Sequence, residues 1–323
     1  MLPPSWAASQ LRLRTPIPFP RWPPGRSGRE PTQRRGTVGD TKGDVQVNRG
    51  VDPEPETSEG MSGSEGRDQP DVSLVMPCYN EERIVAYSIR RLVQAFAREG
   101  YRLELVAVDN GSSDRTGAII GGIAEREAAV VPCRVEQNRG YGYGVLEGMK
   151  RCTAAWVGHI PADSQVDAED VVRLFETALI GGERVVAKVR RRFRMDGLNR
   201  RIVTFVYNAL IRVLWPGLGS FDVNAVPKLL PRDLLAQLRL ESWGWALDPE
   251  MMVKAHHLGV PIVEYNIMSR QRAGGVSHVR MGTAWELFGS LLQLRFSGRL
   301  RAWRRSVQSP RALSETAVGM AGR

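Results

Sequence analysis

The chain has 323 residues, of which 42% are hydrophobic and 25% are charged, a composition that can bury one sizeable core. Its formal net charge of +10 favours anionic partners, namely nucleic acid, an anionic membrane surface or a phosphorylated substrate, without deciding among them. Its three cysteines are unclustered, which argues against a disulfide framework or a zinc site and favours a reducing compartment.

Residues 1–70 are predicted to be a disordered tail, because Pro, Gly, Arg, Ser and Glu dominate it without any apolar period. Met61 is an alternative start, and peptides from residues 1–60 of the natural protein would exclude it. No run of about 18 apolar residues predicts a transmembrane helix. The N-terminus also lacks the apolar core of a secretory signal, so we expect a cytoplasmic protein.

From residue 72 onward, strand patterns alternate with helix patterns. Strands are expected at 72–77, 103–109, 130–136, 154–160 and 184–190, and helices at 81–100, 113–127, 143–152 and from 168. This alternation predicts an α/β fold with a Rossmann-like, mostly parallel sheet and helices on both faces. Ligands bind such sheets at the carboxyl ends of the strands.

The loops after the first four strands are polar: "PCYNEE", "DNGSSDRT", "QNRGYGYG" and "PADSQVD". Turn chemistry alone does not require four successive loops loaded with Asp, Glu, Asn and Arg, so we expect a binding site at this edge. The glycines of "GYGYG" do not have the G-x-G-x-x-G spacing and follow the third strand, which argues against dinucleotide binding.

These loops, with the later segments "WGWALDPEMMVKAHHLG" and "RAGGVS", resemble in order and spacing the family-two glycosyltransferases of GT-A fold. Within that family, the polyprenyl-phosphate (dolichyl-phosphate) mannosyl- and glucosyltransferases are the most similar branch. The resemblance covers roughly residues 72–280 and implies a GT-A glycosyltransferase domain over residues 71–280.

The resemblance implies a set of residues around a nucleotide-sugar donor: Tyr79, Asn80, Glu81, Asp109, Asn138, Arg139, Asp163, Arg272 and Ser277. Asp109 would hold the nucleotide base, with Asn110 in place of the family's second acid. Arg139 would balance diphosphate charge, although a solvated surface arginine is an equal alternative. Arg272 and Ser277 match the family's R-x-x-G-x-S loop, whose guanidinium makes two charge-assisted bonds to phosphate.

The fourth loop resembles the family's D-x-D-x-Q motif, which holds a divalent ion against the donor diphosphate. Pro161 replaces the first acid, but Asp163 and Gln165 remain as oxygen ligands of the kind that Mg²⁺ or Mn²⁺ prefers. We therefore expect metal binding to depend on the donor's own phosphates. Asp167, with Asp170 three residues later, is interpreted as a helix N-cap with an acid in the first turn.

Asp248 and Glu250 are candidate general bases if the acceptor is a sugar or alcohol hydroxyl. If the acceptor is a polyprenyl phosphate, the nucleophile is already anionic, and a carboxylate there would orient sugar hydroxyls instead. The predicted catalytic residues are thus Asp163, Asp248, Glu250 and Arg272, and the predicted acceptor-side residues are Asp222, Lys228 and Trp245.

Two stretches, residues 198–217 and 284–305, combine apolar surface with arginines and would suit the interface of an anionic membrane. An ordinary core helix is the alternative for the first stretch. Residues 281–323 are predicted to be an amphipathic, basic helical tail. We expect peripheral attachment to the cytoplasmic membrane face, and no motif supports nucleic-acid binding.

The sequence therefore predicts an inverting glycosyltransferase that moves a sugar from a UDP- or GDP-sugar to a polyprenyl phosphate. One alternative keeps this chemistry but uses a soluble or glycan hydroxyl as acceptor. Another is a degenerate relative that binds nucleotide without transferring sugar, a possibility raised by Pro161 and Asn110. The joint retention of the donor residues argues against this second alternative.

Overall fold

The computed structural model describes residues 69–193, 198–220, 222–268 and 281–308. Its strands are β1 Val72–Cys78, β2 Leu103–Asn110, β3 Val130–Val135, β4 Trp156–His159, β5 Val186–Phe193, β6 Lys228–Pro231 and β7 Ile262–Met268. Its helices are α1 Val85–Arg98, α2 Thr116–Ala124, α3 Tyr141–Met149, α4 Ala168–Gly181, α5 Leu198–Leu214, α6 Arg232–Leu238, α7 Leu247–His257, α8 Met281–Phe296 and α9 Arg299–Gln308. The predicted alternation is confirmed from β1 to β5. Of the predicted tail, residues 1–68 lie outside the described residues.

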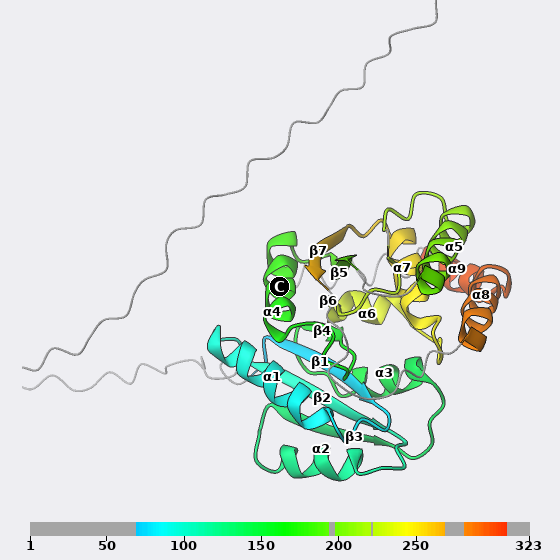
Figure 1. Cartoon of the computed structure of the whole chain (residues 1–323). Coiled ribbons are helices and arrows are strands. Elements are labelled where there is room, and N and C mark those ends of the chain that lie inside the picture. Colours follow the sequence, from blue (N-terminus) through cyan, green and yellow to red (C-terminus); the bar gives the residue numbers. More distant parts are fainter. Residues whose placement is uncertain (1–68, 194–197, 221, 269–280, 309–323) are drawn as a thin grey trace, which may run out of the picture. The chain divides into compact units, whose positions relative to one another are not determined.

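The strands form one sheet in the order β3-β2-β1-β4-β6-β5-β7 (Figure 1). The pairs β1–β2, β2–β3, β1–β4 and β5–β7 are parallel, whereas β6 runs antiparallel to both β4 and β5. Because β6 is reversed, its first residue, Lys228, pairs with the last residue of β4, His159. The start of β6 thus delivers a side chain to the edge where the other strands end.

Side chains alternate between two buried faces along β1 and β2, as the period of two in a strand requires. Leu74 and Met76 belong to one core cluster, beneath α1 and α4, and Val75 belongs to another, beneath α3. The helix α3 lies close to the sheet because Gly148 has no side chain: a Cβ there would be 2.8 Å from the side chain of Val108. The predicted covering of both faces by helices is therefore confirmed.

The helices α8 and α9 are part of the core rather than a separate tail. Leu291, Leu300 and Trp303 are buried in a cluster that also contains Tyr207 and Ile211 of α5. The Trp303 ring N–H donates to the carbonyl of Gln237 in α6 at 3.1 Å. The predicted boundary at residue 280 therefore does not separate two cores in the described part of the chain. Within that part, no helix combines the length and the apolar character needed to cross a membrane.

Candidate active site

The loops that follow β1 and β2 are bonded to each other at the carboxyl edge of the sheet. The side-chain oxygen of Asn80 accepts from the amide of Ser113 at 2.9 Å, and the amide of Asn80 donates to Ser112 Oγ at 3.1 Å. The amide of Glu81 donates to Thr116 Oγ1 at 2.8 Å. Asn80 and Glu81, both predicted near the nucleotide, thus also fix the wall of the predicted pocket.

Asp109 is buried at the end of β2, and its Oδ1 accepts from the amide of Ser112 at 3.0 Å. Gly117, in the first turn of α2, leaves room for this carboxylate, because a Cβ there would be 3.1 Å from the Asp109 carboxyl carbon. Asn110 is also buried, and its Nδ2 donates to the carbonyl of Gly140 at 3.2 Å. The acid predicted to hold the base is therefore fixed in place, and Asn110 connects it to the third loop.

The third loop packs against a segment far along the chain. Gly140 has a φ of 114°, and a Cβ there would lie 2.6 Å from the carbonyl oxygen of Trp243, so a side chain does not fit. The Gly140 amide donates to Asn138 Oδ1 at 2.8 Å. The Arg139 guanidinium lies 5.4 Å from the ring centre of Tyr143 and 6.0 Å from that of Trp243. Arg139 therefore makes cation–π contacts, and its predicted role toward diphosphate stays a prediction.

The fourth loop carries Asp163, which is buried and accepts from the amide of Gln165 at 3.1 Å. Ser164 between them has a φ of 51° in the left-handed region. Ser88 of α1 holds this turn, since its hydroxyl lies 2.6 Å from both the Ala162 carbonyl oxygen and the Ser164 hydroxyl. The contacts of α1 therefore fix the backbone that presents Asp163.

No three His, Cys, Asp or Glu side chains converge on a possible metal position within residues 69–193, 198–220, 222–268 and 281–308. Asp163 and Gln165 still offer two oxygen ligands, and Mg²⁺ commonly takes one or two carboxylates and completes its shell with substrate phosphates and water. The residues present therefore fit an ion that is bound together with a diphosphate.

Asp167 is the N-cap residue of α4, as predicted, with φ −63° and ψ 140°. Its side chain makes no capping hydrogen bond, so the N-cap contributes through backbone geometry and charge. The first turn of α4 carries Glu169 and Asp170, as the N-cap interpretation expected for Asp170. The predicted helix start and the acid in its first turn are therefore confirmed.

A buried ion cluster lies where β4 ends and β6 begins. Asp248 of α7 accepts from His159 Nε2 at 3.0 Å, and the same oxygen contacts the ammonium of Lys228. Burial raises the pKa of Asp248, but the nearby Lys228 and His159 outweigh it and bring this pKa down to about 2. Burial lowers the pKa of Lys228 to about 8, against the opposing effect of Asp248. Near neutral pH, Asp248 is therefore an anion held by its neighbours.

Two further ion pairs continue this cluster across the sheet. Lys188 of β5, which pairs with Lys228 in the sheet, contacts Glu264 of β7 at 2.9 Å. Asp222, predicted on the acceptor side, is bonded to Arg191 of β5 at 3.0 Å. Asp248, Glu264 and Asp222 thus each contact a cation. Lys228 and Asp222, which were both predicted on the acceptor side, bind different partners.

Glu250 has a different surrounding from Asp248, although both stand in the first turn of α7. Its carboxylate accepts from the amides of Glu241 and Ser242 at 3.1 and 2.8 Å, and lies 2.6 Å from the ammonium of Lys254. Glu250 therefore ties the loop before α7 to the helix. The role of Glu250 as a general base stays a prediction, and in the structure its carboxylate fixes the backbone of Glu241 and Ser242.

Trp245 stacks on Tyr141, the first residue of α3, with ring centres 5.4 Å apart and an angle of 13° between the planes. The Tyr141 ring also lies edge-on to His159, with ring centres 6.4 Å apart. Sequence reasoning missed Tyr141 and His159. His159 could have been found from the sequence, because a histidine at the end of a buried strand and shortly before an acidic loop indicates a site residue.

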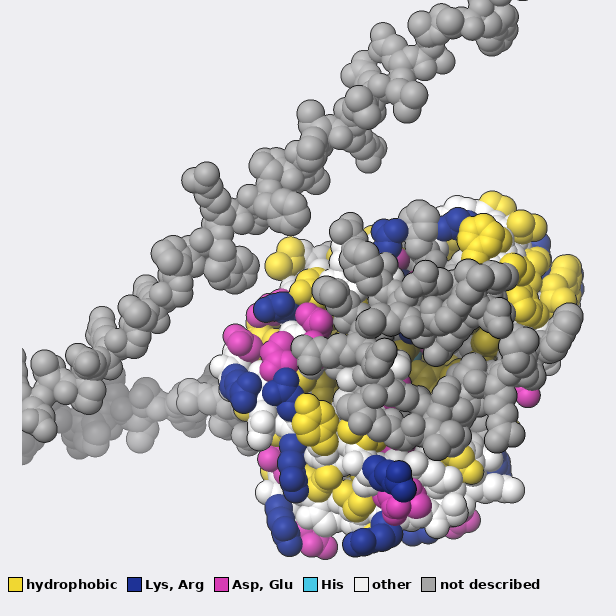
Figure 2. Space-filling model, viewed as in Figure 1, with side chains coloured by type: hydrophobic (Ala, Val, Ile, Leu, Met, Phe, Trp, Pro, Cys, Tyr) yellow, Lys and Arg dark blue, Asp and Glu magenta, His cyan; other side chains and the backbone are white. Residues whose placement is uncertain are grey.

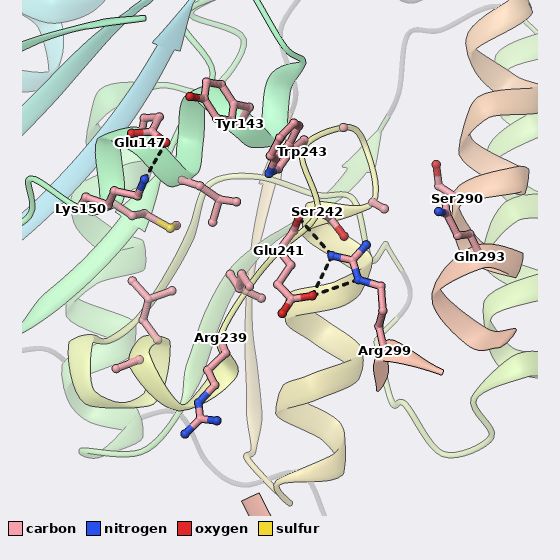
Figure 3. Close-up of a pocket in the computed structure, with 17 residues that line it drawn as sticks. Tyr143, Glu147, Lys150, Arg239, Glu241, Ser242, Trp243, Ser290, Gln293 and Arg299 are labelled. Atoms are coloured by element: carbon pink, nitrogen blue, oxygen red, sulfur yellow. Dashed lines mark hydrogen bonds and ion pairs between the residues drawn. The ribbon is translucent and has the colours of Figure 1, made fainter. Parts of the chain in front are cut away.

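A groove of about 940 Å³ opens behind the loop 241–246, between α3, α6, α8 and the start of α9 (Figure 3). Its apolar lining includes Leu146, Met149, Leu235, Ala236, Leu240 and Trp243. Its charged lining residues include two ion pairs, Lys150–Glu147 and Arg299–Glu241, each 2.7 Å long. Arg239 also lines the groove and leaves its charged lining net positive, so the groove combines an apolar surface with a positive charge.

Arg272 and Ser277, predicted to contact phosphate, lie outside the described residues. Their roles therefore stay predictions from the sequence.

Comparisons with known proteins identify the family and the fold of this chain. The family model described as glycosyl transferase family 2 matches residues 73–237. A bactoprenol glucosyl transferase of Shigella phage SfX is 27% identical over 226 residues, which cover 67% of this chain and 69% of the relative. An undecaprenyl-phosphate 4-deoxy-4-formamido-L-arabinose transferase of Pseudomonas fluorescens is 33% identical over 142 residues, 44% of this chain and only 41% of the relative's length.

Among solved structures, glucosyl-3-phosphoglycerate synthase from Mycobacterium tuberculosis, in complex with Mn²⁺, UDP and phosphoglyceric acid, aligns with a TM-score of 0.58 at 20% identity. The alignment covers 70% of this chain and 79% of that chain, and it supports the predicted GT-A fold. With the family match over more than half of its residues, the chain belongs to glycosyl transferase family 2 and is a glycosyltransferase of GT-A fold.

Proposed function

We propose that this enzyme transfers a sugar, with inversion, from a UDP- or GDP-sugar to a polyprenyl phosphate at the cytoplasmic membrane face. The names of two similar proteins, which describe transfer to bactoprenol and undecaprenyl phosphate, support this acceptor class. The UDP complex of the similar solved structure supports a nucleotide-sugar donor.

The observation that carries the proposal is the state of the two candidate general bases, Asp248 and Glu250. Asp248 is held by Lys228 and His159 and has a pKa of about 2, far below the value near 7 that suits a general base at neutral pH. Glu250 is bonded to two backbone amides and Lys254. A hydroxyl acceptor would need a base that neither supplies readily, whereas a phosphate acceptor is already anionic.

In the proposed reaction, a phosphate oxygen of the acceptor forms a bond with the anomeric carbon of the donor. The bond from that carbon to the diphosphate breaks, and the nucleoside diphosphate leaves with the bonding electrons. Asp109 would orient the base, while Asp163 and Gln165 would hold Mg²⁺ or Mn²⁺ together with the diphosphate. A bound divalent ion would stabilise the negative charge of the leaving group.

The apolar groove supports a lipid acceptor, because the loop 241–246 contributes residues both to the groove and to the cluster around Tyr141. Trp243 of this loop lines the groove, and Trp245 stacks on Tyr141 at the catalytic edge. If the hydrocarbon chain of the acceptor lay in the groove, its phosphate end would therefore lie close to Trp245 and Tyr141.

The exposed side chains of α5 and α8 support membrane attachment. These two helices contact each other, and both carry exposed apolar residues: Phe205, Val206, Val213, Leu292 and Phe296. Figure 2 shows hydrophobic side chains gathered over this part of the surface. The helix α5 also buries Tyr207 and Ile211, so one of its faces packs in the core and the other can contact a bilayer.

The test is transfer of a labelled sugar from UDP- and GDP-sugars to polyprenyl phosphate and, in parallel, to the matching polyprenol, both in vesicles that contain anionic lipid. We expect product with the phosphate alone. Equal transfer to the polyprenol would favour the hydroxyl alternative, and nucleotide binding without transfer to any acceptor would favour the degenerate relative. Binding to the vesicles should weaken when Phe205 and Phe296 are replaced by serine.

A further inference from the structure

The hydroxyl group of Tyr141 is buried and has no hydrogen-bond partner among the described residues. Buried side-chain hydroxyls in folded proteins are nearly always hydrogen-bonded, so one without a partner calls for an explanation. The first turn of α3, to which Tyr141 belongs, is also fixed by the hydrogen bond from the amide of Tyr143 to the carbonyl of Trp243, at 2.8 Å.

The ring of Tyr141 is held on two sides, so the hydroxyl cannot easily turn toward another partner. Trp245 stacks on one face of the ring, and His159 lies edge-on to it. His159 Nδ1 is likewise buried without a hydrogen-bond partner in the described part of the chain. Two unsatisfied polar atoms thus belong to one aromatic cluster at the carboxyl edge of the sheet.

The electrostatic surroundings indicate what could satisfy the hydroxyl. Burial raises the pKa of Tyr141 well above its usual value, and the carboxylates of Asp248 and Asp163 raise it further, so the hydroxyl keeps its proton as a donor. Two carboxylates that accept and one phenol that donates form a set that matches the hydroxyl groups of a sugar.

We propose that Tyr141 is a sugar-binding residue: its hydroxyl donates a hydrogen bond to one hydroxyl oxygen of the transferred sugar, beside the cluster of His159 and Asp248. This inference rests on the proposed function, since it requires a nucleotide-sugar donor. It assigns part of the sugar specificity to a residue at the start of α3, outside the acidic motifs.

The test compares the wild-type enzyme with Tyr141→Phe, using the accepted nucleotide sugar and its monodeoxy analogues. With the complete donor, kcat/KM should fall on the order of tenfold in the variant, because a buried hydrogen bond to the sugar is lost. With the one analogue that lacks the contacted hydroxyl, both enzymes should react equally. The affinity for the nucleoside diphosphate should be unchanged, and the melting temperature without ligand should not fall.

Tyr101→Phe is the matched control, because Tyr101 packs against Phe175 on the face of the sheet opposite to α3 and should leave every donor unaffected. The inference is overturned if the wild-type enzyme and Tyr141→Phe have equal kcat/KM with every donor. It is also overturned if the variant loses the same factor on all donors and melts earlier, which indicates a structural role. A wild-type enzyme that transfers from no nucleotide sugar would instead refute the proposed function, and this inference with it.

Discussion

Replacing Asp248 by Asn tests the buried ion cluster most directly. Lys228 is fully buried and Asp248 is 5% exposed, so the variant leaves a buried ammonium without its anion. Removal of one partner from a buried ion pair typically costs about 3 to 5 kcal/mol. We therefore expect Asp248→Asn to lower the free energy of unfolding by about this amount at pH 7.

The pH dependence of this loss follows from the pKa of Asp248, which falls from an ordinary 3.8 to about 2 in the folded state, a difference worth about 2 kcal/mol. Because the folded pKa is lowered, this stabilisation is fully present above pH 3.8 and is lost as the pH falls toward 2. The advantage of the wild-type enzyme over Asp248→Asn should therefore narrow in acid. The reason is that protonation of Asp248 leaves Lys228 without an anionic partner in the wild-type enzyme as well.

The assay is urea unfolding of the wild-type enzyme, Asp248→Asn, Lys228→Met and the double variant. The double variant removes both charges, so it should recover most of the stability that either single variant loses. The exposed Glu241–Arg299 pair is the control, and Glu241→Gln should cost less than about 1 kcal/mol. Strictly additive losses at Asp248 and Lys228 would refute the ion pair.

Four further predictions concern the site. Asp163→Ala should abolish transfer. In thermal-shift measurements of the wild-type enzyme, a nucleotide sugar should raise the melting temperature more with Mg²⁺ or Mn²⁺ than with EDTA, and in Asp163→Ala this difference should disappear. Asp167→Ala should lower the free energy of unfolding by less than about 1 kcal/mol, because this N-cap side chain makes no capping hydrogen bond, and a larger loss would indicate one. Gly117→Ala should weaken nucleotide binding in calorimetry, because its methyl group displaces the buried carboxylate at the end of β2. The rate of transfer to polyprenyl phosphate should fall only below about pH 6, where a phosphate monoester takes up its second proton, and a rate that falls near pH 7 or above on acidification would indicate a base on the enzyme.

The first half of the sheet could be predicted from the sequence because its signals are local. The apolar runs at Val72–Cys78 and Leu103–Asn110 are long enough to be recognised as buried strands, and the polar loops after them mark the edge of the site. The strand Lys228–Pro231 was not predicted, since a four-residue segment that follows one proline and ends in another shows no period. Its antiparallel direction depends on contacts with β4 and β5 that no local pattern encodes.

The residues of the acceptor side were only partly predicted, because their contacts also join distant parts of the sequence. Lys228 and Asp248 were both predicted at the site, but they come from different elements, and no local pattern pairs them. His159 was counted only as part of an apolar strand, although its ring lies between that strand and α7. The burial of Leu291 and Trp303 was equally hidden, because arginines nearby suggested a membrane surface.

The charge balance of the acceptor side bears on the choice between acceptors. Three carboxylates in this region would repel an incoming phosphate if they stood alone, but each contacts a cation: Asp248 with Lys228, Glu264 with Lys188, and Asp222 with Arg191. An enzyme that activates a hydroxyl needs the opposite arrangement, a carboxylate whose pKa is raised toward neutrality. Here the neighbouring ammonium and imidazole lower the pKa of Asp248 instead. If the acceptor binds at this end of the sheet, as we propose, the same ion pairs that stabilise it would therefore favour an anionic acceptor over a neutral one.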